Sequence, residues 1–164
     1  MGLFDFIKDA GESVFGKDED PKEAAAELAA AKAKKAAVEA RRVQTLTKYV
    51  GRLGLEIDDL GIAVDGDVVV VSGTVATQEV KEKIVLALGN TAGTARVDDR
   101  ITVEVEEPEA TFHTVVSGDS LSKIAKKYYG DPMKYTVIFE ANKPMLSDPD
   151  KIYPGQVLRI PSAA

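Results

Sequence analysis

The sequence of 164 residues contains no cysteine, no tryptophan and a single histidine, His113. The absence of cysteine excludes disulfides, thiolate metal sites, iron–sulfur clusters and a cysteine nucleophile. One histidine cannot build a histidine-rich zinc or iron site, and any Ser-His-Asp triad would depend on that residue alone. The composition therefore predicts a small protein without transition-metal chemistry and without enzymatic activity.

The sequence also lacks a long hydrophobic run, since none approaches the ~18 residues that a helix needs to cross a bilayer. The first ten residues carry Asp5 within an apolar stretch and no basic segment before it, so they do not resemble a secretory signal. The apolar residues between Leu3 and Ile7 could anchor the chain on a membrane surface, but the neighbouring acidic side chains would repel anionic lipid. We expect a cytoplasmic protein without stable membrane insertion.

Positive charge is in the minority, because the formal net charge is −6 and the pI is about 4.9. This balance argues against general nucleic-acid binding. The charge is unevenly distributed, with a net +5 in residues 21–53 and a net −9 in residues 54–110. Residues 106–110 (Glu-Glu-Pro-Glu-Ala) predict an extended acidic linker, because proline interrupts a strand and like charges repel. Separate folded units are expected on the two sides of this linker.

The longest predicted element is a helix that begins at Pro21 and continues through residues 22–53, which are rich in Ala, Lys, Arg and Glu. Only its second half, from Val43, carries a regular apolar face. We expect that half to pack against the core and the alanine-rich half to be an exposed extension. The basic residues between Lys32 and Arg42 could bind nucleic acid or acidic lipid, but a solvated helix face explains them more simply.

The other predicted elements of the first unit combine strands with a second helix. Residues 2–14 predict a short helix or turn that ends near Gly11. Residues 60–64 alternate and lead into an Asp-Gly-Asp turn, and a β-branched run follows at residues 68–74, so the two segments predict a hairpin. Residues 78–88 predict a helix, and residues 95–105 predict a strand. This order indicates an α+β fold in which helices pack on one face of a small mixed sheet.

After the linker, residues 111–162 predict a second unit of β-α-α-β order. Strands are expected at residues 112–116 and 157–160, and helices at residues 120–129 and 135–141. A Gly-Asp-Pro sequence separates the two helices, because glycine and proline both interrupt a helix.

Motifs in this second unit resemble the LysM domain family. The resemblance lies in three segments, which read TVVSGDSLSKIA from Thr114, IFEAN from Ile138 and IYPGQVLRIP from Ile152. Because the segments cover most of the unit, the resemblance is specific, and it implies a βααβ LysM fold.

The first unit resembles a BON domain. The resemblance covers residues 54–105 and rests on the hairpin and on the spacing of Gly89, Gly93 and the Val-Asp-Asp sequence at Val97. The chain also opens with Met-Gly-Leu-Phe, carries KDAGE from Lys8, and carries Ala-Asn-Lys-Pro-Met-Leu in its second unit. This combination resembles the family of bacterial cytoplasmic potassium-binding proteins, in which a BON domain precedes a LysM domain.

The resemblance implies how the chain is divided and where it departs from the family. The expected parts are an N-terminal segment that packs on the BON domain, the BON domain with an extended first helix, a linker and the LysM domain, at residues 1–20, 21–105, 106–110 and 111–162. The long basic helix is not accounted for by the family. Thr91 and Thr94 stand where bulky apolar residues are expected.

The resemblance also implies a potassium site made of main-chain carbonyl groups. Such groups suit a large, singly charged ion because they can replace its hydration shell, whereas clustered carboxylates favour calcium or magnesium. Unpaired carbonyl groups occur where a helix ends, and glycine lets the chain turn sharply there. Ordinary helix ends would equally explain the glycines at Gly11 and Gly89. The carbonyl groups that the resemblance assigns to the ion are those of Ile7, Lys8, Ala10, Gly89, Thr91 and Thr94.

The function implied by the resemblance is that of an ion sensor. Potassium, with Rb⁺ and Cs⁺ as substitutes, is expected to hold the N-terminal segment against the BON domain. An ion that binds only the closed state stabilises that state by mass action. The BON and LysM domains are then expected to become compact around the bound ion in a monomer.

Two other functions stay open at this point. The chain could be a structural adaptor that associates through the helix at residues 22–53. LysM domains generally recognise N-acetylglucosamine polymers such as peptidoglycan, so cell-wall glycan could bind between two loops of the second unit. The residues of these loops are Gly118, Asp119, Ser120, Leu121, Asn142, Lys143, Pro144 and Met145.

Catalysis is the least favoured interpretation. The acidic pairs at Asp58 and Asp98 consist of adjacent residues, which point to opposite faces of a strand and so do not form an acid–base pair. His113 has no visible nucleophile partner, and no catalytic residue is assigned.

Overall fold

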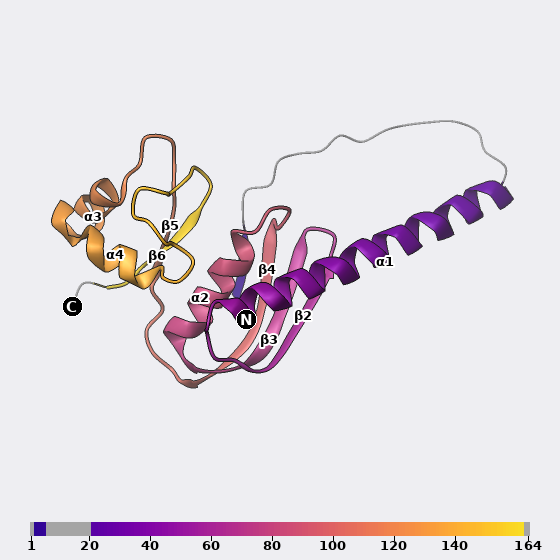
Figure 1. Ribbon diagram of the computed structural model, residues 1–164, viewed down its shortest axis with the longest axis horizontal. Helices are drawn as coiled ribbons and strands as arrows, with labels where there is room; N and C mark the ends of the chain where they lie inside the picture. Colours follow the sequence, from indigo (N-terminus) through magenta and orange to yellow (C-terminus); the bar gives the residue numbers. More distant parts are fainter. Residues whose placement is uncertain (1, 6–20, 163–164) are drawn as a thin grey trace.

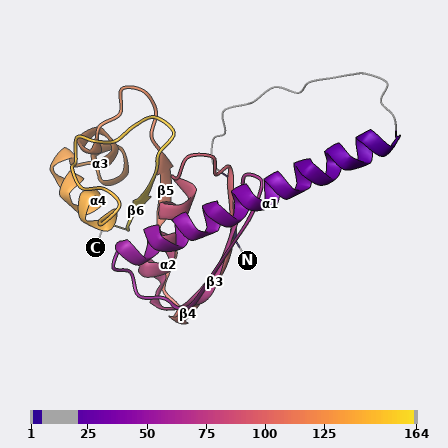
Figure 2. The same cartoon turned by 45° about the vertical axis from the view of Figure 1, so that its right-hand side comes forward.

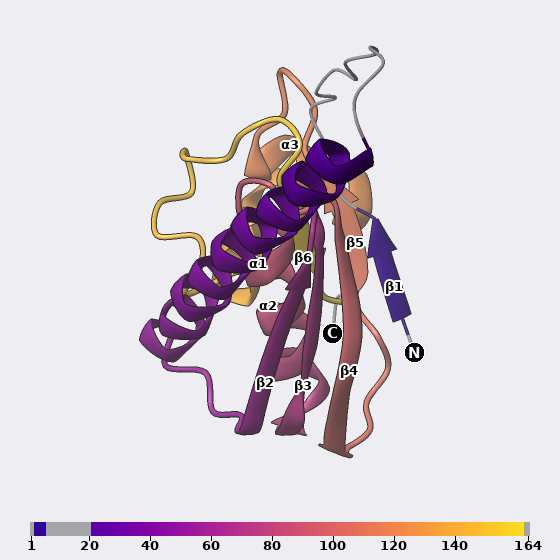
Figure 3. The ribbon, with the colours of Figure 1, turned by 90° about the vertical axis from the view of Figure 1, so that its right-hand side faces the viewer.

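The structure of the protein, a computed structural model, describes residues 2–5 and 21–162. The first unit contains a four-stranded sheet in the order β1-β4-β3-β2 (Figure 3). Strands β2 and β3 form an antiparallel hairpin, β3 and β4 are parallel, and β1 pairs antiparallel with the free edge of β4. The strands are β1 (Gly2–Asp5), β2 (Asp58–Asp65), β3 (Val68–Thr77) and β4 (Arg96–Val105).

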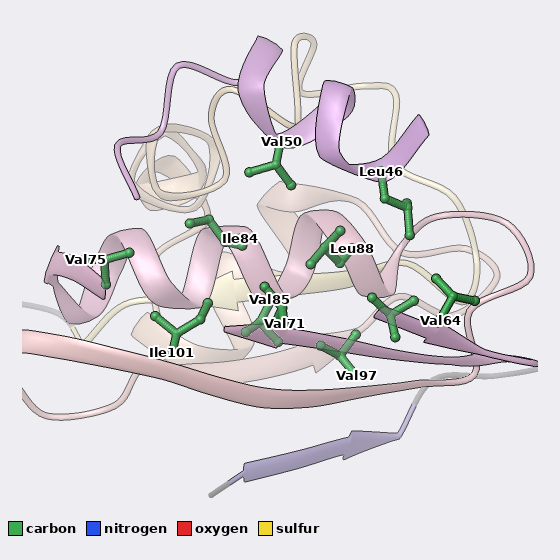
Figure 4. Packing of buried hydrophobic residues seen from close by; sticks show 11 residues of the cluster. Leu46, Val50, Val64, Val71, Val75, Ile84, Val85, Leu88, Val97 and Ile101 are labelled. Atoms are coloured by element: carbon green, nitrogen blue, oxygen red, sulfur yellow. The ribbon is translucent and has the colours of Figure 1, made fainter. Parts of the chain in front are cut away.

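Helices α1 (Pro21–Arg52) and α2 (Gln78–Gly89) cover one face of this sheet (Figure 4). Helix α2 connects the parallel strands β3 and β4, and the hydroxyl of Thr77 accepts a hydrogen bond from the Val80 N–H at its start. The core contains buried residues of both helices and of β2, β3 and β4. They are Leu46, Val50, Val64, Val69, Val71, Val75, Ile84, Val85, Leu88, Val97 and Ile101.

Helix α1 divides into two halves of opposite exposure. Residues 22–38 are exposed, including Leu28 at 57 % and Val38 at 66 %, whereas Leu46 and Val50 are 3 % and 0 % exposed. Figures 1 and 2 show the first half extending away from the sheet. The prediction that only the second half packs is therefore confirmed.

The prediction of a helix or turn for residues 2–14 is wrong where the structure describes them, because residues 2–5 form strand β1. The free edge of β4 offers a row of unpaired N–H and C=O groups, and pairing with them outweighs local helix propensity. The rest of that segment lies outside the described residues.

The second unit is a two-stranded antiparallel sheet, β5 and β6, packed with short helices. The 3-10 helix between α3 and α4 is not among the predicted elements; the Asp131 side chain accepts a hydrogen bond from the Met133 N–H at its start. The α+β fold predicted for the chain is confirmed. The elements are β5 (Thr111–Thr114), α3 (Leu121–Tyr129), η1 (Pro132–Lys134), α4 (Tyr135–Ala141) and β6 (Val157–Ile160).

No helix within residues 2–5 and 21–162 combines the length and the apolar character that crossing a membrane requires.

Candidate functional site

The candidate site lies in the loop that joins α2 to β4. Helix α2 ends at Gly89, and the N–H of Asn90 donates to the Leu86 carbonyl at 2.9 Å. The Thr91 N–H donates to the Leu88 carbonyl at 3.2 Å, and Gly93 has a φ of +80°, which favours glycine. The loop is thus held by the last turn of the helix.

The three carbonyl groups predicted in this loop differ in their surroundings. Gly89 and Thr94 are both buried residues, and no hydrogen bond from the described part of the loop reaches the Gly89 carbonyl, which belongs to the last residue of α2. The carbonyl of Thr91 accepts one hydrogen bond, from the Thr94 N–H at 3.2 Å, and a carbonyl oxygen has a second lone pair. The last carbonyl groups of a helix have no partner within the helix, so the end of α2 offers acceptors that suit a cation.

The two threonines form a hydrogen-bonded chain with Arg42. The Thr91 hydroxyl donates to the Leu88 carbonyl at 2.5 Å, so it accepts from the Thr94 hydroxyl, which lies 2.9 Å away. The Thr94 hydroxyl in turn accepts from Arg42 Nη2 at 2.6 Å, while Nη1 donates to the Gly66 carbonyl at 2.8 Å. The threonines therefore bind the loop to α1 through polar contacts in place of apolar packing.

A cavity of about 460 Å³ lies beside the loop, against α1. Three cationic side chains, those of Arg42, Lys48 and Arg52, line it. Like charges repel most strongly where water is partly excluded, so this cavity disfavours a potassium ion. Its other lining residues are Thr45, Leu46, Tyr49, Thr91 and Ala92.

The other half of the predicted site, Ile7, Lys8 and Ala10, lies outside the described residues. Strand β1 nevertheless fixes the position from which the chain continues toward these residues. Asp5, its last residue, is opposite Arg96, which follows Thr94 by two positions. The chain thus leaves β1 at the end of the sheet where the loop enters β4.

The residues that the structure describes contain no group of three His, Cys, Asp or Glu side chains arranged to hold a metal ion. The two adjacent acidic residues of β4, Asp98 and Asp99, each pair with a neighbouring basic side chain. Asp98 accepts from Arg100 Nη2 at 2.8 Å, and Asp99 forms a buried ion pair with Lys81 at 3.0 Å.

The loop is also where the second unit contacts the first. The Asn90 side chain donates to the Val157 carbonyl and accepts from the Val157 N–H, both at 2.9 Å. The Tyr153 hydroxyl donates to the Asn90 carbonyl at 3.4 Å, and partial burial raises the pKa of Tyr153. Asn90 therefore links the loop to β6.

A second contact between the units is centred on the buried carboxylate of Glu82, in the middle of α2. It accepts from Arg159 Nε at 2.5 Å, from the Ala110 N–H at 2.9 Å and from Gln78 Nε2 at 3.1 Å. Neither this contact nor that of Asn90 is predicted from the sequence. The available signal in the sequence is the run of five apolar residues from Ile84 to Leu88, because a helical segment that is apolar on all sides packs on more than one side.

The first of the two predicted glycan loops is largely engaged in its own structure. Asp119 accepts from the Val116 N–H and lies 2.9 Å from His113 Nε2, and these two contacts hold the pKa of Asp119 below its ordinary value, with the His113 hydrogen bond as the larger cause. Ser120 caps α3, and Leu121 is buried in the core. Only Gly118 is exposed.

The second predicted glycan loop likewise contains both residues that belong to the fold and residues that are exposed. Asn142 is buried, and its side chain pairs with the N–H and C=O of Arg159 in β6, both at 2.8 Å. Met145 is half-buried, while Lys143 and Pro144 are exposed. The structure therefore assigns Leu121 and Asn142 to the fold of the second unit.

Comparisons with known proteins identify both units. The model of the BON domain matches residues 40–105, and that of the LysM domain matches residues 113–161. The chain is 58 % identical over 85 residues to the potassium binding protein Kbp of Escherichia coli, an alignment that covers 52 % of this chain and 57 % of that protein.

Two further relatives match shorter parts. An uncharacterized protein of Deinococcus radiodurans is 55 % identical over 56 residues, which are 34 % of this chain and 21 % of that protein. An esterase of Mycobacterium tuberculosis is 45 % identical over 53 residues, 32 % of this chain and 11 % of the esterase. The chain thus spans less than two thirds of the length of each of these relatives.

Proposed function

We propose that this chain, in which a BON domain is followed by a LysM domain, is a cytoplasmic potassium-ion sensor. The observation that carries the proposal is the end of α2, where no hydrogen bond from the described part of the following loop reaches the carbonyl of the buried residue Gly89. The similarity to the potassium binding protein Kbp supports the choice of ion. No catalytic role is proposed for any residue.

The chemistry of the loop favours an alkali ion. Neutral carbonyl oxygens match the weak field of potassium, whereas calcium and magnesium prefer carboxylates and water. The acidic pair of β4 is already paired with Arg100 and Lys81.

The carbonyl groups of Ile7, Lys8 and Ala10 would complete the ligand set with those of Gly89, Thr91 and Thr94. The pairing of Asp5 with Arg96 supports this assignment, because it starts the N-terminal segment next to the loop. Potassium would then order that segment against the BON domain and stabilise the compact arrangement of the BON and LysM domains by mass action. Rubidium and caesium should substitute for it.

Calorimetric titration of the salt-free protein tests the proposal. Potassium, rubidium and caesium chlorides should each give a saturable heat of binding, and sodium chloride should give none. An equal response to sodium, or no response to potassium, would overturn the proposal.

Glycan binding is the second candidate, because the LysM match covers residues 113–161. A pull-down on insoluble peptidoglycan distinguishes it from ion sensing. Strong retention that does not change with potassium would favour glycan binding. A structural adaptor that associates through α1 would instead form oligomers whose size depends on protein concentration.

A further inference from the structure

We propose that the side chain of Asn90 couples the ion-binding loop to the LysM domain, so that β6 responds to occupancy of the site. The inference rests on the proposed function and adds the residue through which the ion regulates domain docking. Asn90 contacts β6 directly, and it lies between two residues whose carbonyl groups are assigned to the ion, Gly89 and Thr91.

The contact resembles the addition of one residue to the sheet. In the antiparallel pair of β5 and β6, the Gln156 carbonyl accepts from the Val115 N–H at 2.8 Å. Main-chain groups alternate between the two edges of a strand, so those of Val157 face away from β5. The Asn90 amide has one donor and one acceptor group, and it satisfies both groups of Val157 at 2.9 Å.

The LysM domain closes the rest of this edge by itself. Arg159, the next residue that faces away from β5, pairs in the same manner with Asn142, at 2.8 Å for both bonds. The edge is thus completed by two asparagines, of which Asn142 belongs to the LysM domain and Asn90 to the BON domain. Of these two main-chain contacts along the edge of β6, the one at Val157 joins the two domains.

The covalent geometry of the loop links this contact to the ion. The Gly89 carbonyl and the Asn90 N–H belong to one planar peptide group, so an ion that fixes the carbonyl also fixes the start of Asn90. An ion that also binds the Thr91 carbonyl constrains the main chain on the other side of Asn90. The contact between Glu82 and Arg159, by contrast, comes from the middle of α2, and we expect it to form independently of the ion.

Binding equilibria that are coupled affect each other equally. If Asn90 transmits the ion's effect to β6, loss of its side chain weakens potassium binding as well as the response of β6. Coupling between two sites typically changes an affinity by about 5-fold to 150-fold. Because the substitution removes two hydrogen bonds, we expect the affinity for potassium to fall by an amount near the lower end of this range, about 5-fold to 10-fold.

The test is a titration of the ¹⁵N-labelled full chain with KCl, with NaCl as the control salt, followed by NMR. In the wild type, the amide signals of Gly93 in the loop and of Val157 in β6 should shift together. In Asn90→Ala, Gly93 should still shift, with an affinity about 5-fold to 10-fold lower, and Val157 should no longer follow. Asn90→Asp keeps the shape of the side chain but cannot donate to the Val157 carbonyl when it is ionised. The Val157 signal should therefore also stop following potassium in this variant.

Tyr153→Phe is the matched control, because it removes only the 3.4 Å contact to the Asn90 carbonyl. Both signals should respond in this variant as in the wild type. A Val157 signal that follows potassium in Asn90→Ala with the wild-type midpoint would overturn the coupling while leaving the proposed function intact. Absence of a potassium-specific shift at Gly93 in the wild type would overturn the proposed function, and the coupling with it.

Discussion

The carboxylate of Glu82 accepts a hydrogen bond from Arg159 Nε at 2.5 Å, and this contact joins helix α2 of the BON domain to strand β6 of the LysM domain. The side chains are 3 % and 12 % exposed. Two further donors, the Ala110 N–H and Gln78 Nε2, reach the same carboxylate. A buried charge is tolerated when it is paired and hydrogen-bonded in this manner. The interface between the domains therefore depends on an intact ion pair.

Glu82→Gln should destabilise the protein by up to about 3 kcal/mol, because it leaves the largely buried Arg159 guanidinium with only the carboxylate of Glu79, 4.0 Å away, as a counter-charge. Urea denaturation followed by circular dichroism measures the change. Glu140→Gln is the control, since that carboxylate is 65 % exposed and pairs with Lys143 on the surface of the LysM domain, and it should cost less than about 1 kcal/mol. Equal effects of the two substitutions would contradict the account of the interface.

Replacing the threonines of the loop should preserve ion binding. Thr91→Val and Thr94→Val each remove a hydroxyl from the chain of hydrogen bonds that starts at Arg42, at a stability cost of about 1 kcal/mol for each lost bond. The main-chain carbonyl groups stay in place, so calorimetry with KCl should still give saturable binding. Complete loss of binding in a folded variant would show that the hydroxyl groups themselves are ligands.

The two halves of α1 should differ sharply in their contribution to stability. Leu46→Ala removes a side chain that is 3 % exposed and should cost about 2–5 kcal/mol. Leu28→Ala, on the same helix at 57 % exposure, should change the free energy of unfolding by less than about 0.5 kcal/mol. Thermal and urea unfolding measure both, and a large effect of Leu28→Ala would mean that a partner covers the projecting half.

Acid should weaken the LysM domain through Asp119. Its hydrogen bonds from His113 and from the Val116 N–H lower its pKa below the ordinary 3.8. A depressed pKa stabilises the fold above pH 3.8, and this contribution is lost as the pH falls through the lower folded value.

Unfolding by urea at several values between about pH 5 and pH 2 tests this dependence. Asp119→Asn should reduce the loss of stability at low pH, whereas Glu140→Gln, at an exposed carboxylate, should not. An unchanged pH dependence in Asp119→Asn would contradict the assignment.

The order of helices and strands is predictable from the sequence because most elements carry their own periodic pattern and end signals. The hairpin at residues 60–74 has alternating residues before its turn and a β-branched run after it, and Thr77 caps the following helix. Strand β1 is different, because its structure comes from pairing with β4 and no local pattern records a distant partner.

The candidate site is predictable only in part for a similar reason. The glycine that ends α2 indicates a turn with free carbonyl groups, but ligands of this kind leave no diagnostic residue type. The contacts of Arg42 with Thr94 and of Asn90 with Val157 join residues 52 and 67 positions apart. Such pairs become visible only once the sheet and both helices are placed.

The most direct test of the potassium site is a crystal structure of the full chain grown in KCl, with anomalous scattering recorded near the potassium absorption edge. The account predicts one strong anomalous peak in contact with the carbonyl oxygens of Gly89, Thr91 and Thr94, with the N-terminal segment completing its coordination. A peak at another place in the molecule, or a loop without any peak under saturating potassium, would contradict it.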